Sequence, residues 1–289
     1  MNPALWGMMT ALGWGSADFI ARFTGRAMGH ETALLGMLGV GALVLPVIVW
    51  QADVPWHWQP AGWWLLLLTG VGVMVATLLL YWGLARGPVT VVAPIVGSYP
   101  ALNLALAVIL GTRPTLVQWL AMAVVLIGVV TVAVSARSFE ARLEFTRGHL
   151  RTTVTIALGS SLGFAVTVAA AQAAEPIYGQ LQTVCIGRWI SLLAIGLVFA
   201  WRRRAPRIHL RWWPWLTAQG LLDGGAYIAL LAGSQGPRSA IAVVVASSFS
   251  AVTVVLARLI LRELMTWLQW GGIVLIVAGV GTLSWYGET

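Results

Sequence analysis

Ten long apolar stretches run through the chain, separated by short polar segments. A helix needs about 20 residues to cross a hydrocarbon core of about 30 Å, and each stretch is close to that length. The apolar runs are continuous and do not alternate with polar residues, so they predict spanning helices and not the strands of a membrane barrel. We expect spans at residues 3–22, 32–51, 61–85, 88–110, 115–136, 153–174, 177–200, 212–235, 239–261 and 266–286.

The second five stretches carry a shifted copy of the pattern in the first five. The repeated residues are Gly87, Pro88, Thr115, Gln118, Gly128 and Val129, matched by Gly236, Pro237, Thr266, Gln269, Gly279 and Val280. Because five is odd, the two halves have opposite orientations in a bilayer, a plan that secondary transporters use to bind solute near the midplane. We expect a first repeat over 1–136, a basic cytoplasmic linker over 137–152 and a second repeat over 153–289, around a central cavity.

Composition agrees with lipid as the solvent. Hydrophobic residues make up 59% of the chain and charged residues 9%, with a mean hydropathy of +0.87, which excludes an ordinary soluble domain. The pattern predicts an all-α polytopic membrane protein. A phosphate-binding loop needs a lysine that this chain lacks, so a gradient and not ATP is the expected energy source. A lone cysteine, Cys185, and histidines without ligand spacing predict neither a metal nor a cofactor.

The arginines predict the orientation of the chain. Fourteen of the 17 lie in or beside the loops that follow odd-numbered spans: Arg22, Arg26, Arg86, Arg137, Arg142, Arg147, Arg151, Arg202, Arg203, Arg204, Arg207, Arg211, Arg258 and Arg262. The loops that follow even-numbered spans hold only Arg113 and Arg238. Retained positive charge marks the cytoplasmic side, so both termini are expected outside a bacterial cytoplasmic membrane. This topology accounts for the net charge of +8 without a nucleic-acid partner.

Two charged residues fall in the middle of predicted spans. Arg188 is the twelfth residue of the seventh span and Asp223 the twelfth of the eighth, so antiparallel neighbours bring them together. An ionisable side chain at this depth is by default a functional hypothesis. Gln219, Asp223 and Tyr227 recur every four residues and share a helix face, which we expect to look into the cavity. Arg188 and Asp223 either hold a solute, with Asp223 as a proton-coupling candidate, or form a structural pair.

The first half offers further candidates for the solute site. Trp14, Tyr81, Tyr99 and Asn103 lie at similar depth, the last two on one helix face. Asp18 shares a helix face with Trp14 and is a second coupling candidate, although an ion pair with Arg22 one turn later explains it equally well. Three prolines in the fourth span, Pro88, Pro94 and Pro100, predict a broken helix that could serve as a gate.

The chain resembles the EamA-type transporters of the drug/metabolite transporter superfamily over nearly its whole length. The resemblance rests on the doubled five-helix plan and on Trp14-Gly15-Ser16, Asp18-Phe19, Arg262-Glu263, Thr266, Gln269-Trp270 and Gly279-Val280. It implies ten helices around a central cavity that move metabolites or amino acids, often outward, by alternating access. Relatives tend to carry an acidic residue after both the fourth and the ninth helix, whereas this chain has Thr112 opposite Glu263.

These observations favour a secondary transporter, most simply an exporter of a small amphipathic or zwitterionic, amino-acid-like metabolite. The alternatives are an importer of a similar solute, an intramembrane enzyme with an aspartate as its base, and an accessory subunit that transports nothing. The expected partners are a small molecule and the lipid bilayer. The sequence leaves the oligomeric state open and is compatible with a monomer.

Overall fold

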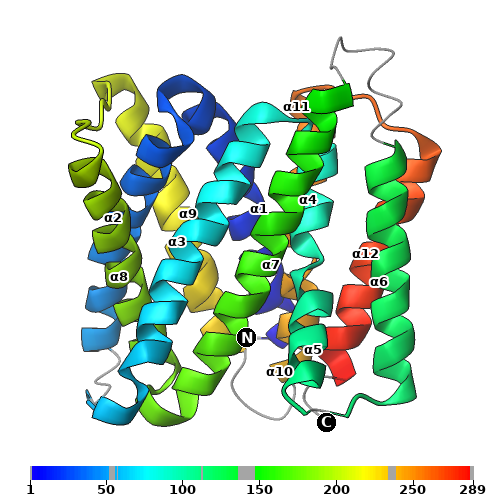
Figure 1. Ribbon diagram of the computed structural model, residues 1–289, viewed down its shortest axis with the longest axis horizontal. Helices are drawn as coiled ribbons and strands as arrows, with labels where there is room; N and C mark the ends of the chain where they lie inside the picture. The colour runs from blue at the N-terminus through cyan, green and yellow to red at the C-terminus, as the bar shows by residue number, and fades with distance from the viewer. Residues whose placement is uncertain are drawn as a thin grey trace.

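The structure is a computed structural model that describes residues 2–51, 56, 58–111, 113–135, 147–233 and 239–286. The described residues form helices and contain no strand (Figure 1). The helices are α1 (Pro3–Met28), α2 (His30–Gln51), α3 (Trp63–Arg86), α4 (Val89–Gly97), α5 (Tyr99–Ile109), α6 (Leu116–Ser135), α7 (Arg147–Tyr178), α8 (Gln180–Trp201), α9 (Trp213–Gly233), α10 (Ser239–Ala246), α11 (Phe249–Ile260) and α12 (Trp267–Tyr286), with short 3-10 turns at Pro60–Gly62 and Leu210–Trp212.

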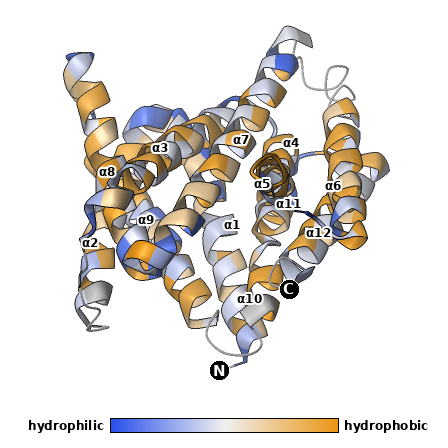
Figure 2. Cartoon of the chain, turned by 60° about the horizontal axis from the view of Figure 1, so that its bottom comes forward, coloured by the Kyte–Doolittle hydropathy of each residue, from blue (hydrophilic) through white to orange (hydrophobic). Residues whose placement is uncertain are grey.

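Eight helical segments are long and apolar enough to cross a membrane; α4 and α5 together form one of them, and α10 and α11 another. The two long helices that fall short, α1 and α9, carry polar side chains and glycines along their middle. These two helices pack along each other. In Figure 2 α1 is correspondingly paler than the orange helices around it.

Several helices are longer than their apolar stretches predict. The first was expected to end at residue 22 but continues to Met28, where Gly29 takes a left-handed backbone with φ of 86°. The sixth was expected to begin at residue 153 but begins at Arg147, so residues 147–152 of the expected linker are helical. A helix continues past the apolar region until a residue breaks its hydrogen bonding, and hydropathy does not report that residue. Residues 136–146 lie outside the described residues.

The fourth and ninth predicted spans are each broken in the middle. Ser98 separates α4 from α5, and its hydroxyl donates to the Ile95 carbonyl over 2.7 Å. Ser248 ends the break between α10 and α11, and its hydroxyl donates to the Val245 carbonyl over 2.6 Å. The two breaks face each other, because a Cβ atom on Gly97 would lie 2.6 Å from the Cβ of Ser250. The same two carbonyls also accept the backbone N–H groups of Ser98 and Ser248, so each serine closes a tight turn at its break.

The repeated threonine and glutamine form matching helix caps. At the start of α6, the Gln118 side chain accepts from the Thr115 backbone N–H, and the Thr115 hydroxyl accepts from the Gln118 N–H. Thr266 and Gln269 form the same reciprocal pair at the start of α12. This is a capping box, which satisfies N–H groups that the helix itself cannot. The sequence repeat therefore marks equivalent helix starts.

The two capped helices pack directly against each other. A Cβ atom on Gly128 of α6 would lie 2.7 Å from the Gly272 carbonyl oxygen of α12. Gly279 approaches α6 as closely, with 2.9 Å from its Cβ position to the Ala121 carbonyl oxygen. Glycines thus bring the two backbones together, and in Figure 1 the pair stands at one side of the bundle.

The bundle has two faces that differ in arginine content. The arginine-rich face, at the top of Figure 1, carries the connections that follow α1, α3, α8 and α11. The arginine-poor face, at the bottom, carries both chain termini and the connections that follow α2, α5 and α7. Among the described residues, Arg113 is the arginine beside this second face.

Candidate functional site

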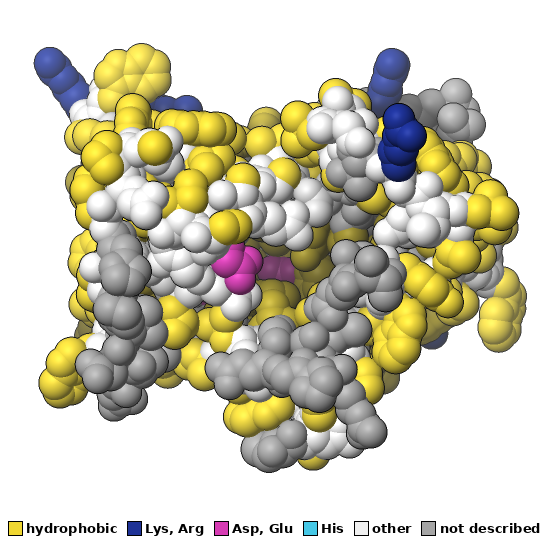
Figure 3. Space-filling model, turned by 90° about the horizontal axis from the view of Figure 1, so that it is seen from below, with side chains coloured by type: hydrophobic (Ala, Val, Ile, Leu, Met, Phe, Trp, Pro, Cys, Tyr) yellow, Lys and Arg dark blue, Asp and Glu magenta, His cyan; other side chains and the backbone are white. Residues whose placement is uncertain are grey.

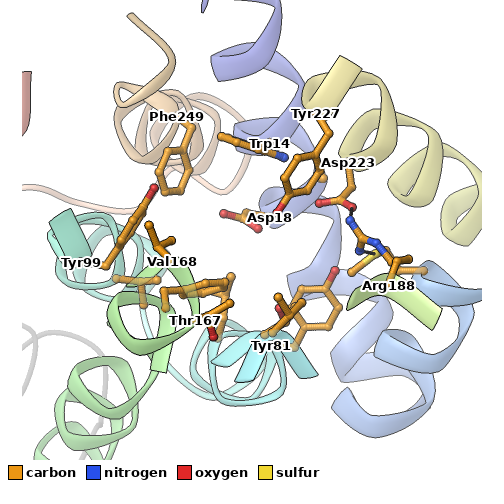
Figure 4. A pocket seen from close by; sticks show the side chains of 17 residues that line it. Trp14, Asp18, Tyr81, Tyr99, Thr167, Val168, Arg188, Asp223, Tyr227 and Phe249 are labelled. Atoms are coloured by element: carbon orange, nitrogen blue, oxygen red, sulfur yellow. Dashed lines mark hydrogen bonds and ion pairs between the residues drawn. The ribbon is translucent and has the colours of Figure 1, made fainter. Parts of the chain in front are cut away.

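An inner chamber lies at the centre of the bundle, with a volume of about 120 Å³ open to the centres of water molecules. Residues of α1, α2, α3, α4, α5, α7, α8, α9 and α11 line it, and Figure 4 shows their side chains around the chamber. The side chains that face it include Trp14, Asp18, Tyr81, Tyr99, Phe164, Arg188, Asp223, Tyr227 and Phe249. Seven of the nine residues proposed from the sequence thus line one cavity; Gln219 and Asn103 do not.

Arg188 and Asp223 form an ion pair, Nη2 to Oδ2, at 2.5 Å. The Arg188 side chain is 4% exposed and that of Asp223 17%. The Arg188 guanidinium also lies 3.6 Å from the Met37 sulfur and 5.5 Å from the centre of the Tyr227 ring. Arg188 is therefore held on several sides, whereas Asp223 still reaches the chamber.

Asp18 is arranged differently. It projects into the chamber from the middle of α1 and forms no hydrogen bond or ion pair with any described residue (Figure 4). The expected alternative partner, Arg22, instead lies 3.2 Å from Glu263. Asp18 and Asp223 are close enough to interact electrostatically. The chamber thus holds one carboxylate that is paired with a cation and one that is not.

Gln219 supports the chamber from behind. It is fully buried, and its amide donates to the Tyr81 hydroxyl while its carbonyl accepts from the Thr24 hydroxyl. Gln219 therefore fixes the direction of the Tyr81 phenol, which does line the chamber. Asn103 lies in α5 beyond the chamber, where its amide donates to the Gln172 side chain over 3.4 Å. Helix periodicity placed Gln219 on the face of Asp223 and Asn103 on the face of Tyr99. It does not show which neighbouring helix or cavity each side chain on that face contacts.

Aromatic rings form much of the remaining wall. Trp14 stands nearly perpendicular to both Tyr227 and Phe249, with ring centres 5.0 Å and 6.0 Å away. Tyr99 lies 6.0 Å from Phe164. Phe164 and Phe249 were missed from the sequence because a phenylalanine in an apolar run gives no polar signal. One signal was present for Phe249: it follows Ser248 as Tyr99 follows Ser98, so Tyr99 and Phe249 occupy corresponding positions in the two halves.

The chamber opens towards the arginine-poor face. A second, outer chamber of about 330 Å³ shares Trp14, Tyr99, Arg188 and Tyr227 with the first. It continues past Gln172 to Glu175 and Gln180, at the connection between α7 and α8. Figure 3 shows this face hollowed, with acidic side chains at the hollow. A solute can therefore approach Asp18 from this side.

Glu263 stands at the arginine-rich face, beyond the chamber. Its carboxylate accepts from the backbone N–H groups of Val89 and Thr90, both at 3.1 Å, and from the Thr90 hydroxyl at 2.9 Å. Arg22 bridges Glu263 and the Gly87 carbonyl. A carboxylate at a helix N-terminus satisfies free N–H groups and the helix dipole. We name Glu263, Arg22 and the first turn of α4 the inner latch. The counterpart position Thr112 lies outside the described residues.

The comparisons with known proteins agree with this architecture. The EamA-like transporter family, part of the drug/metabolite transporter superfamily, matches residues 1–134 and again residues 151–285. No curated protein matches the chain. A solved structure described as "Crystal structure of protein" is similar in fold, with a TM-score of 0.67 at 15% identity, over 97% of this chain and 95% of that one.

Proposed function

Because the chain belongs to the EamA-like transporter family, we propose that it is a secondary transporter that exports a small amphipathic metabolite by alternating access. It is an integral membrane protein, and members of its family are transporters and not enzymes. The observation that carries the proposal is a chamber in the middle of an apolar bundle that holds Asp18, Arg188 and Asp223 and opens on the arginine-poor face, while the inner latch joins helices at the other face. A solute held there can be released on either side if the closed face opens.

Two inverted repeats of five spans are part of the proposal. In the two halves α1 corresponds to α7, α2 to α8 and α3 to α9. Exchanging each helix for its counterpart turns the contact of α3 with α7 into that of α9 with α1. The same exchange relates the contact of α3 with α8 to that of α9 with α2. In Figure 1 α1 starts on the lower side and α7 on the upper side, as counterparts of opposite orientation do. This pairing supports a pseudo-two-fold axis through the chamber.

The arginine-rich face is proposed to be cytoplasmic, with both termini outside. The chamber of this conformation then opens outward, and the inner latch closes the cytoplasmic side. Inward opening requires α4 to move away from Glu263 and Arg22. The hinge for this motion is the break at Ser98, which already lacks continuous helical hydrogen bonding. The broken fourth span is thus proposed as the gate.

Weakening the latch tests this mechanism without knowledge of the solute. A Glu263→Gln variant loses the negative charge and one acceptor oxygen opposite Arg22 and the α4 N-terminus. Hydrogen bonds to charged groups contribute about 1.5–3 kcal/mol each, and a loss of that size shifts a two-state equilibrium by roughly tenfold or more. We expect the inward-open state to become correspondingly more populated.

The readout is the accessibility of a cysteine placed behind the latch. Cys185 is replaced by serine, and Val92, fully buried in α4, by cysteine. A maleimide that does not cross membranes, added at the arginine-rich face of vesicles, is expected to label Val92→Cys slowly, and several times faster when Glu263→Gln is present. Glu31→Gln, which removes a carboxylate paired with Arg202 on the same face, should leave the rate unchanged. An unlabelled cysteine in all variants would contradict alternating access at this gate.

Import is the second candidate direction, because the open outer chamber is also where an importer loads its solute. Flux into and out of liposomes that contain only this chain separates the two directions. It also separates both from an accessory subunit, which moves nothing by itself. Net accumulation inside vesicles whose lumen adjoins the arginine-rich face would reverse the proposed direction.

A further inference from the structure

We propose that the transported solute is an organic monocation, an ammonium group with apolar substituents, which Asp18 neutralises inside a cage of aromatic rings. This inference rests on the proposed transport function and names the solute class of the same chamber. It differs from an amino-acid-like zwitterion, because only the cationic end of a solute finds a free partner here.

The first support is the charge balance of the chamber. Arg188 and Asp223 neutralise each other through their 2.5 Å contact. Asp18 has no such partner among the described residues, and no other described side chain with a full charge lines the inner chamber. With both carboxylates ionised, the three groups sum to one negative charge. A buried charge without a counter-charge is costly, so the chamber favours a monocation.

A carboxylate on the solute has no comparable partner. Arg188 is the one cation lining the inner chamber among the described residues, and its side chain is 4% exposed. Its guanidinium is taken up by Asp223, with Met37 and the Tyr227 ring beside it. An anionic group would have to displace Asp223 and then lie near Asp18. A zwitterion therefore gains less from this site than a cation does.

The second support is the shape and chemistry of the wall. Trp14 is nearly perpendicular to Tyr227, at 78°, and to Phe249, at 81°, so the three rings form adjoining sides of a box. Figure 4 shows Asp18 between these rings and Tyr99. Aromatic faces attract cations through their quadrupole, and quaternary ammonium ligands are recognised in such boxes. Arg188 already lies 5.5 Å over the Tyr227 ring in this way.

The approach from outside matches the same charge. Glu175 lies at the mouth of the outer chamber, where its exposed side chain adds a second negative charge along the path. A cleft lined by one sign of charge raises the local concentration of the opposite ion. The route thus begins at the carboxylate of Glu175 and ends at that of Asp18, and the one cation beside it, Arg188, is paired with Asp223.

Asp18 also provides coupling, because one carboxylate binds either a proton or an organic cation. The groups that face it are Asp223 and Tyr227 on α9, Arg188 on α8, Tyr81 on α3 and Tyr99 on α5. When the cation binds, the Asp18 proton leaves to water; when the cation leaves, a proton returns. Exchange of one for the other gives antiport. Cation binding should weaken as pH falls, because protonated Asp18 carries no charge.

Four probes of similar size and different charge test the solute class. They are tetramethylammonium, a monocation; trimethylglycine, a zwitterion; neopentyl alcohol, neutral; and pivalate, an anion. Titration calorimetry on the purified full chain in detergent measures binding of each. We expect tetramethylammonium to bind at least about tenfold more tightly than the other three, as a desolvated cation over aromatic rings should. Tighter binding of trimethylglycine or pivalate overturns the inference while leaving the transport proposal intact.

Two variants locate the site, each with a matched control. Asp18→Asn keeps the shape of the side chain and should weaken tetramethylammonium binding at least about tenfold, as loss of a desolvated charge partner does. Glu31→Gln, which removes a carboxylate on the arginine-rich face, should leave it unchanged. Trp14→Leu should also weaken binding, whereas Trp189→Leu, on the outer surface, should not.

The pH dependence separates Asp18 from the remaining groups. In the unsubstituted chain tetramethylammonium binding should weaken as pH falls, and in Asp18→Asn the residual binding should lose that dependence. Unchanged affinity in both Asp18→Asn and Trp14→Leu overturns the inference, as does failure of tetramethylammonium to bind the unsubstituted chain. Labelling behind the latch does not depend on the solute, so it reports separately on alternating access.

Discussion

Removing the carboxylate of Asp223 leaves the guanidinium of Arg188 charged and without a counter-ion. In the Asp223→Asn variant, the remaining contacts of Arg188 are the Met37 sulfur at 3.6 Å and the Tyr227 ring at 5.5 Å. Neither carries a charge. The Arg188 side chain is 4% exposed, so water cannot replace the lost partner without a change in packing. We therefore expect a large loss of stability from a substitution that changes one oxygen to nitrogen.

The size of the loss follows from the burial of the pair. At an effective dielectric constant near 20, two unit charges about 4 Å apart attract by about 4 kcal/mol. Breaking a buried pair by removing one partner costs about 3–5 kcal/mol in proteins. For large domains each kcal/mol corresponds to about 2–4 °C. The melting temperature of Asp223→Asn should therefore fall by roughly 10 °C.

Scanning fluorimetry of the variants in detergent checks this value. Arg188→Met/Asp223→Leu removes both charges and should be more stable than Asp223→Asn, because apolar residues can replace a buried pair at little cost. Glu31→Gln breaks a pair whose arginine, Arg202, is 45% exposed, and should change stability by at most about 1 kcal/mol. If Asp223→Asn has the same melting temperature as the unsubstituted protein, Arg188 is not held as a buried charge and the reasoning is refuted.

Two further substitutions probe packing and orientation. Gly272→Ala places a Cβ atom 3.0 Å from the Gly128 carbonyl oxygen and should lower the free energy of unfolding by about 1–3 kcal/mol. Gly196→Ala is the control, because a Cβ atom there has no neighbour within 4 Å, and it should not destabilise the protein. Equal effects of the two substitutions would contradict close packing of α6 and α12. Gln219→Leu removes the hydrogen-bond partner of the Tyr81 hydroxyl and should cost about 1–3 kcal/mol as well as weakening solute binding; a variant that binds normally would show that Tyr81 needs no support.

Hydropathy predicted the order and type of the elements. Of the two breaks within spans, the sequence indicated the one between α4 and α5 but not the one between α10 and α11. Prolines indicated that the fourth span is broken, with Pro94 inside α4 and Pro100 at the start of α5. The ninth span has no proline near its break, where Ser247 and Ser248 bond the carbonyls of the preceding turn. Serine within an apolar run is compatible with an intact helix. The second break therefore depends on tertiary packing that a local pattern does not record.

The meeting of Arg188 and Asp223 was predictable from their equal depth, but not for the reason expected. The two residues form an ion pair, yet α2 packs against both α8 and α9, and the long Arg188 side chain passes Gly41 of α2 to reach Asp223. Asp18 and Arg22 are one turn apart, which suggested a pair, yet Arg22 contacts Glu263 from the other end of the chain. Helix spacing cannot rank a neighbour one turn away against a partner that only the folded bundle brings near. The inner latch was hidden for the same reason.

The polarity of α1 and α9 has a consequence for biosynthesis. A nascent helix enters lipid from the translocon when its own residues are apolar enough, and charged residues at its centre oppose that step. Neither α1 nor α9 reaches the hydropathy of the other spans, and each packs against the other in the finished bundle. α1 is synthesised well before α9, the helix against which it packs. Until α9 has been synthesised, α1 of the nascent chain must therefore pack against apolar neighbours or an insertase.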